Sequence, residues 1–316
     1  MKNQINKWTG GALLAGLSLV TLSAAAQDVG NLEQGMAAPA PQPVKPEEET
    51  GRQPVIVNGG VSEQFNSSID NGGNFSLTRV KLGVGVPVNL KEGVQLGTTF
   101  RYEYDHYNFD NIPSPWENIN TFSLASILQW QMNDLWTVYG GGFVKMSAES
   151  GSSLGDGTTG GGLAGFSYKV NDDLSLGLGL AVASQLEENA AVLPLITARW
   201  KINDSWRLDA GLTDVTTVGY GVELKYLLDQ EFDFGFGVQF HKSRFKIDAL
   251  DGYGQEEAAT IYADATWHAS PHVEFGGFLG LATGGKLRVD NSSGDKVYQS
   301  DYDPAAVLGV KATLRF

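Results

Sequence analysis

The chain has 316 residues, and 36 acidic against 22 basic residues give it a formal net charge of −14 at pH 7. This excess of negative charge argues against a nucleic-acid partner, because the phosphates would be repelled. The sequence contains no cysteine, which excludes a disulfide-rich secreted scaffold and any metal site built from thiolates.

The first residues have the order of a secretory signal. Lys2 and Lys7 precede the apolar segment Gly11–Leu22, and Ala24–Ala26 supplies the small residues of a cleavage site. The apolar segment is shorter than the roughly 20 residues that a membrane-spanning helix needs. We therefore predict a signal peptide at residues 1–26, cleaved after Ala26, rather than a membrane anchor.

Residues 27–53 are rich in proline, alanine and glutamate and show no apolar period. This composition predicts a flexible periplasmic linker, which is either a spacer or a tether to periplasmic partners, and it favours the spacer. From Pro54 to Phe316 apolar and polar residues alternate with period two, as in "TFSLASILQWQM" and "FDFGFGVQF". The pattern predicts an all-β domain at residues 54–316 with almost no helix.

The connections between these predicted strands are of two kinds. Short turns rich in Asn, Asp and Ser lie near residues 89–93, 133–135, 171–173, 203–205, 229–231 and 270–272. Longer polar connections lie near residues 108–120, 149–159, 249–257 and 291–303, although the links near Glu188 and Asp214 are brief. Short connections at one end of the strands and long ones at the other are typical of an outer-membrane β-barrel.

The number of strands follows from the turns. Six short turns need 12 flanking strands, Pro304–Phe316 adds another, and Pro54–Phe65 completes an even number. We predict a transmembrane antiparallel up-and-down barrel of 14 strands. Twelve strands are the alternative, because the segments near Trp206 and Pro54 have the weakest alternation.

Aromatic residues recur on both sides of the short turns, as in "WQMNDLW" at Trp130–Trp136 and "WKINDSW" at Trp200–Trp206. Large rings with a polar edge belong at a membrane–water interface, whereas a soluble β-sandwich has no reason to place them at strand ends. A second cluster, "FRYEYDHYNF" at Phe100–Phe109, lies at the opposite strand end. The predicted interfacial residues are Trp130, Trp136, Tyr168, Trp200, Trp206, Tyr226, Phe232, Trp267 and Phe316.

The C-terminal strand ends in Phe316 and is apolar at every second position back to Leu308. It resembles the recognition strand of bacterial outer-membrane proteins, which implies insertion by the barrel assembly machinery. The segments "FSLTRVKLGVGVPV", "LPLITARWKINDSWRLDAGL" and "YDPAAVLGVKATLRF" resemble an uncharacterised family of outer-membrane barrels, classed as a domain of unknown function. That resemblance implies the fold and the bacterial outer membrane as location, and it transfers no substrate and no catalytic residue.

Side chains of the parity opposite to the tryptophans are predicted to face the lumen, because a charge facing lipid is costly. This inward set is mixed and leans basic, while the acids of the long connections, among them Asp105, Glu256 and Asp290, are predicted to form an outer acidic rim. The predicted lumen-lining residues are Arg79, Lys81, Arg101, Glu103, Lys145, Lys169, Arg199, Lys201, Arg207, Asp209, Glu223, Lys225, Asp264, Lys311 and Arg315.

Three functions fit this interior. Inward bases could line a narrow passive channel for small polar or weakly anionic solutes. Alternatively, opposite charges on neighbouring strands pair and fill a closed structural or surface-interaction barrel with no transport activity. Transport of apolar substrates is the third; the charged inward residues argue against it, although the inward Tyr139 and Phe143 keep it open.

No pattern of catalytic residues is evident, and we predict no enzyme activity, no cofactor and no metal. His268 and His272 flank a turn, but a hairpin does not bring residues at this spacing onto one face as a helix does. No G-x-S-x-G motif occurs. The expected partners are outer-membrane lipids and lipopolysaccharide, the latter through the acidic loops.

Overall fold

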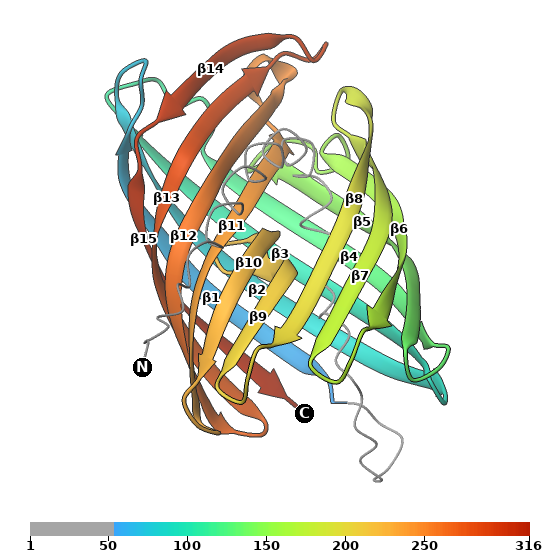
Figure 1. Ribbon diagram of the computed structural model, residues 1–316. Helices are drawn as coiled ribbons and strands as arrows, with labels where there is room; N and C mark the ends of the chain where they lie inside the picture. Colours follow the sequence, from blue (N-terminus) through green and yellow to red (C-terminus); the bar gives the residue numbers. More distant parts are fainter. Residues whose placement is uncertain (1–53) are drawn as a thin grey trace, which may run out of the picture.

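The computed structural model describes residues 54–316, so the predicted signal peptide and linker lie outside the described residues. Nearly all of residues 54–316 form extended strands (Figure 1). The strands are β1 (Ile56–Ser68), β2 (Asn74–Lys91), β3 (Val94–Asp110), β4 (Asn118–Gln131), β5 (Trp136–Glu149), β6 (Thr158–Lys169), β7 (Leu174–Gln185), β8 (Glu188–Lys201), β9 (Trp206–Asp214), β10 (Val218–Leu227), β11 (Phe232–Lys246), β12 (Tyr253–Ser270), β13 (Val273–Asp290), β14 (Lys296–Tyr302) and β15 (Ala305–Arg315).

Each strand from β1 to β13 pairs antiparallel with the next strand of the chain, and β15 pairs with both β13 and β1. β14 also pairs with β13, so β14 and β15 are two pieces of one strand, interrupted at Asp303 and Pro304. Proline cannot donate to a strand ladder, which accounts for a break at this point. The predicted closed barrel of 14 antiparallel strands is confirmed.

A single 3-10 turn, η1 (Ala249–Asp251), is the helical structure found within residues 54–316. In that same range, no helix is long and apolar enough to cross a membrane.

The recurrent polar turns share one hydrogen-bonding pattern. In the turn between β4 and β5, Asn133 Oδ1 accepts hydrogen bonds from the backbone N–H groups of Leu135 and Trp136, both at 2.9 Å. These local bonds stabilise the chain reversal, because the side-chain oxygen accepts from backbone N–H groups that have no strand partner within the turn. The same pattern is made by Asn171, Asn203 and Asp229.

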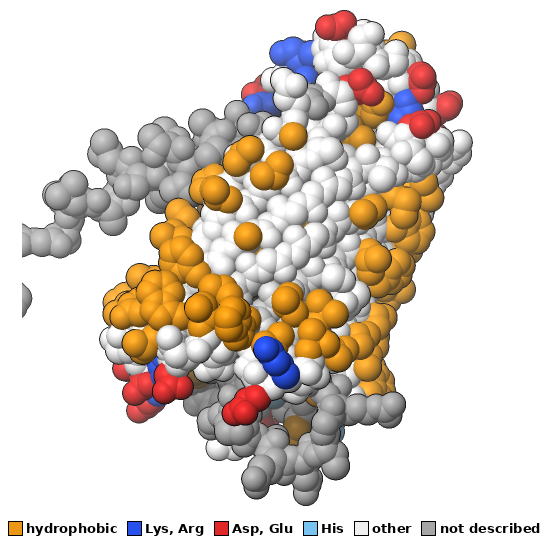
Figure 2. Space-filling model, turned by 90° about the vertical axis from the view of Figure 1, so that its right-hand side faces the viewer, with side chains coloured by type: hydrophobic (Ala, Val, Ile, Leu, Met, Phe, Trp, Pro, Cys, Tyr) orange, Lys and Arg blue, Asp and Glu red, His pale blue; other side chains and the backbone are white. Residues whose placement is uncertain are grey.

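Side chains alternate between an apolar outer face and an inner face of mixed character. On β4, Leu124 is 51% exposed on the outer surface, whereas its neighbours Ser123 and Ala125 are buried inside. The predicted interfacial aromatics lie near the short turns, where they pair across strands: Trp136 faces Tyr168, and Trp206 faces Tyr226. In Figure 2 hydrophobic side chains lie mainly over the lower part and along the right-hand edge of the face shown, and charged side chains gather towards its top and bottom.

The outward position of Leu124 predicts a large effect of charge. Leu124→Arg should lower the free energy of unfolding in phospholipid vesicles by about 2–4 kcal/mol, because the guanidinium would face hydrocarbon near the middle of the strand. Leu135→Arg, in a short turn, should change it by about 1 kcal/mol or less. Urea titration of both variants in vesicles measures the difference, and equal losses would contradict a lipid-facing Leu124.

The aromatic cluster Phe100–Phe109 divides between the two faces of β3. Tyr102 and Tyr104 lie on the outer parity, but Tyr107 is buried and Phe109 packs beside it in the interior. The expectation that the cluster forms one interfacial group is therefore wrong for its last residues. The strand continues its alternation beyond the membrane-facing part, so its end rings turn towards the barrel axis.

Candidate channel lumen

The long-connection end of the barrel is filled by an apolar cluster. Trp116 is 1% exposed, and its ring centroid lies 5.2 Å from that of Phe245 and 5.6 Å from that of Tyr107. Its members come from the segments around β1 to β4 and β11 to β14, so the packing occupies that side of the interior. We call it the outer plug; its buried members are Ile69, Phe75, Leu77, Tyr107, Trp116, Ile119, Phe245, Ile247, Ala258, Leu287, Val289 and Tyr302.

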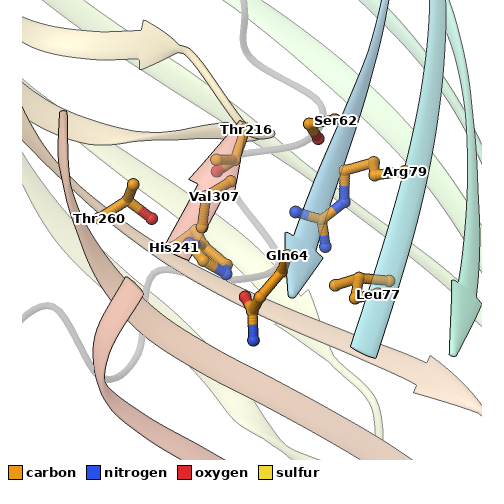
Figure 3. A pocket seen from close by; sticks show the side chains of 8 residues that line it. All are labelled: Ser62, Gln64, Leu77, Arg79, Thr216, His241, Thr260 and Val307. Atoms are coloured by element: carbon orange, nitrogen blue, oxygen red, sulfur yellow. The ribbon is translucent and has the colours of Figure 1, made fainter. Parts of the chain in front are cut away.

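An ionic cluster lies beside the outer plug, between β2, β3, β11 and β12. Arg79 makes a bidentate contact with Asp105, at 2.7 and 3.1 Å, while His241 Nε2 and Tyr302 Oη lie 3.0 and 2.7 Å from carboxylate oxygens of Glu256. The adjoining cavity has a volume of only about 10 Å³, room for about one water molecule. Figure 3 places Arg79, His241 and Gln64 around it.

The tip of the β9–β10 hairpin lies inside the barrel. Asp214, at the end of β9, is bound by Lys81 Nζ at 2.6 Å and by Arg101 Nη2 at 3.0 Å. Thr217 Oγ1 donates to Glu103 at 2.9 Å, and Gln239 Nε2 donates to the carbonyl of Thr217 at 2.7 Å. The tip is therefore held to β2, β3 and β11, and it occupies the lumen at mid-height.

At the short-turn end the interior is polar and partly open to solvent. Arg199 and Arg207 both bind Asp209, at 3.1 and 2.7 Å, and Arg315 binds Glu274 at 2.9 Å. The side chains of these three arginines remain 32–33% exposed. We call this region the inner mouth.

Two of the predicted lumen residues, Lys169 and Lys201, lie at the rim of the inner mouth rather than deep within it. Each binds an aspartate of its own turn at 2.6 Å, Asp172 and Asp204 respectively. The hydrogen bond and charge of the lysine hold the pKa of each of these exposed carboxyls below its usual range.

The other predicted lumen residues lie on the inner parity of their strands. Their charges are compensated, since the inward bases other than Lys145 each lie 2.6–3.9 Å from a carboxylate oxygen. Lys145 Nζ lies 3.4 Å from the carbonyl oxygen of Arg244. The remaining acids, Glu223 and Asp264, lie near Lys225 and Lys311.

The expected outer acidic rim is wrong for three residues. Asp105, Glu256 and Asp290 are 2%, 0% and 0% exposed, and they lie inside, paired with Arg79, His241 and Arg244. These acids belong to long strands that continue past the membrane, so their inward parity persists where the sequence suggested loops. The parity of Asp105 with Arg101 and Glu103 was the available signal.

The opposite side of the interior is apolar. Inward side chains of β4 to β8 form a cluster that we call the apolar wall: Ala125, Phe143, Ala181, Ala183, Ala191, Leu193 and Leu195, with Leu163, Leu212 and Tyr220 packed against them. Sequence reasoning identified only Phe143 and Tyr139 on this side. The interior is thus divided into an ion-paired half and an apolar half.

No group of three or more His, Asp or Glu residues within residues 54–316 has the geometry to hold a metal ion.

The sheet is closed and antiparallel, its outer face is apolar with tryptophans near the short turns, and its ionised side chains are enclosed. These features together define the chain as an outer-membrane β-barrel. A family described as "Domain of unknown function (DUF6268)" matches residues 130–305, which is more than half of the chain. The chain belongs to this family. A comparison with curated proteins found no match.

Solved structures with a similar fold are outer-membrane proteins. A FadL homologue from Pseudomonas aeruginosa aligns with a TM-score of 0.51 and 10% identity, over 84% of this chain and 90% of its own. The COG4313 outer membrane channel from Pseudomonas putida F1 aligns with a TM-score of 0.48 and 12% identity, over 86% of this chain and 100% of its own. At 10% identity, the likeness to the FadL homologue shows the fold alone.

Proposed function

We propose that the chain is a passive outer-membrane channel for small solutes, which rests in a closed state. The observation that carries the proposal is the placement of the β9–β10 tip in the lumen, held there by Lys81 and Arg101 on Asp214. A segment fastened by a few polar contacts can move away without unfolding the barrel, whereas a continuous core cannot. This favours a gated channel over a permanently closed structural barrel.

The inner mouth supports small polar or weakly anionic solutes as the class that passes. Its arginines are partly exposed and keep donors available to a solute, although each already has a carboxylate neighbour. Because the charges are compensated, the preference for anions over cations should be weak.

Planar-bilayer recordings of the purified barrel test this proposal. We expect brief openings of small conductance and, in a salt gradient, a reversal potential slightly on the anion-selective side. The matched preparation is the same protein unfolded by heating before addition, which should give no openings. Absence of openings above that background across a wide voltage range would favour the closed structural barrel.

The proposal includes export by a signal peptide cleaved after Ala26, insertion by the barrel assembly machinery, and contacts of the outer loops with lipopolysaccharide. It assigns the chain no catalytic reaction and no cofactor.

A further inference from the structure

The wall of the barrel is interrupted between β8 and β9. These strands pair only from Ala198 to Lys201, opposite Arg207 to Ala210, whereas every other pair of neighbouring strands up to β13 has at least eight paired positions. Residues 188–197 of β8 have no strand partner on this side within the described part of the chain. In Figure 1, β9 and β10 are short and end well below the upper end of β8.

The bend that causes this interruption begins at Gly211. This glycine follows Ala210, the last residue of β9 that pairs with β8. It has a φ of +137°, a conformation that residues with a side chain rarely adopt. If the register continued beyond Ala210, Asp214 would stand opposite Pro194. Asp214 instead lies in the lumen on Lys81 and Arg101, so the inward fold of the tip and the gap in the wall have one cause.

Pro194 is suited to an unpaired edge. The N–H of Lys201 points towards β7 and donates to the carbonyl of Asp173. The N–H of the next residue, Ile202, points towards β9 and donates to the carbonyl of Trp206. Because backbone groups alternate sides along a strand, the backbone nitrogen of residue 194 faces the missing partner, and proline there has no N–H to leave unpaired. The sequence of β8 therefore matches an interruption of the wall.

The interruption lies at membrane depth and is lined by apolar side chains. Val192 and Ile196 are 63% and 57% exposed on the outer face, while Leu193 and Leu195 on the inner face pack in the apolar wall with Leu212. Backbone groups without partners are tolerated at this depth only when they meet protein or a cavity with water. Within the described residues, Leu193, Leu195 and Leu212 pack at this seam, without the ladder of backbone hydrogen bonds that joins the other neighbouring strands.

The upper end of the seam is bridged. Arg244 Nε donates to the carbonyl of Leu186 at 3.2 Å, and Tyr253 Oη donates to Glu187 at 2.8 Å. The unpaired stretch is thus bounded above by these contacts and below by the paired foot of β9. A bounded seam can part and reclose while the barrel stays intact.

We infer that the seam between β8 and the β9–β10 hairpin is a lateral entrance, through which small apolar molecules dissolved in the outer membrane reach the apolar wall of the lumen. Apolar solutes suit it because they need no polar partner while they pass Leu193 and Leu195. The inference goes beyond the proposed function by adding a second way into the same lumen, and its test does not depend on conductance.

Cysteine labelling tests the entrance, because the chain has no cysteine of its own. Leu193→Cys, in the full-length protein reconstituted into vesicles, is treated with dodecylmaleimide, which dissolves in the bilayer, or with a sulfonated maleimide confined to water. Ala258→Cys, buried in the outer plug on β12 and not part of the apolar wall, is the matched control, and Ile196→Cys on the lipid face is the positive control. Leu195→Cys replaces Leu193→Cys if that variant does not fold.

We expect Leu193→Cys to react with dodecylmaleimide no more than about ten times more slowly than Ile196→Cys. That is the rate expected if the seam is open in about 10% of the molecules at any time. Ala258→Cys should react far more slowly, and 1-decanol should slow the reaction at Leu193→Cys more than at Ile196→Cys. Failure of Leu193→Cys to react with dodecylmaleimide would overturn the entrance, as would equal rates at Leu193→Cys and Ala258→Cys or reaction with the sulfonated reagent alone. Labelling without conductance would leave the entrance standing and remove the proposed axial channel.

Discussion

Asp214→Asn is expected to open the channel. The substitution removes the negative charge that Lys81 and Arg101 share, at 2.6 and 3.0 Å, and leaves two neighbouring positive charges that repel each other. Loss of these contacts should weaken the closed state by about 2–3 kcal/mol. Since each 1.4 kcal/mol is a factor of about ten, the ratio of open to closed channels should rise by about 30- to 140-fold, measured as open probability in planar bilayers.

The control for this experiment is Asp172→Asn, the same chemical change in a turn at the inner mouth. Asp172 is 93% exposed and forms an ion pair with Lys169 of the same turn at 2.6 Å. Its loss should leave the open probability unchanged. If Asp214→Asn behaves like Asp172→Asn, the β9–β10 tip does not close the channel.

Trp116→Ala is expected to cause the largest loss of stability. The indole is buried in the outer plug between Phe245, Tyr107 and Phe109, with centroid separations of 5.2–5.7 Å. Its removal leaves a cavity that the surrounding strands can fill only in part, and the free energy of unfolding should fall by about 3–5 kcal/mol. Urea titration in phospholipid vesicles measures the change. The folded fraction is read on gel electrophoresis of unheated samples, in which a folded barrel migrates faster than the unfolded chain.

Trp130→Ala is the matched control, because Trp130 is 45% exposed on the outer face and loses fewer protein contacts. Its effect should be less than half of that at Trp116. Comparable losses for the two variants would mean that the outer plug contributes little to the stability of the barrel.

The sequence predicted the fold because each strand is specified locally. Asn or Asp marks four of the six reversals at the inner mouth, and its side chain there accepts the turn hydrogen bonds itself. Period-two alternation then assigns each residue to a face without knowledge of its neighbours. The strand near Trp206, whose alternation was weakest, is the one that leaves the wall early.

The state of the lumen could not be predicted in the same way. Asp214 and Lys81 are separated by 133 positions in the chain, so no local pattern places them together. The predicted acidic rim failed for a related reason. β12 and β13 each have 18 residues, well beyond the roughly 9–11 that cross a bilayer, and Glu256 and Asp290 stay on strands that were expected to have ended.

The pairing of β1 with β15, which closes the barrel, has a consequence for biosynthesis. The antiparallel pairing of β1 with β15, from Ile56 opposite Arg315 to Gln64 opposite Val307, unites the two ends of the described sheet. A polypeptide cut short before β15 would carry two bare edges into the periplasm, each able to recruit a stray strand. Completion of the ring therefore distinguishes finished polypeptides from fragments, and fragments should be preferred targets of periplasmic proteases.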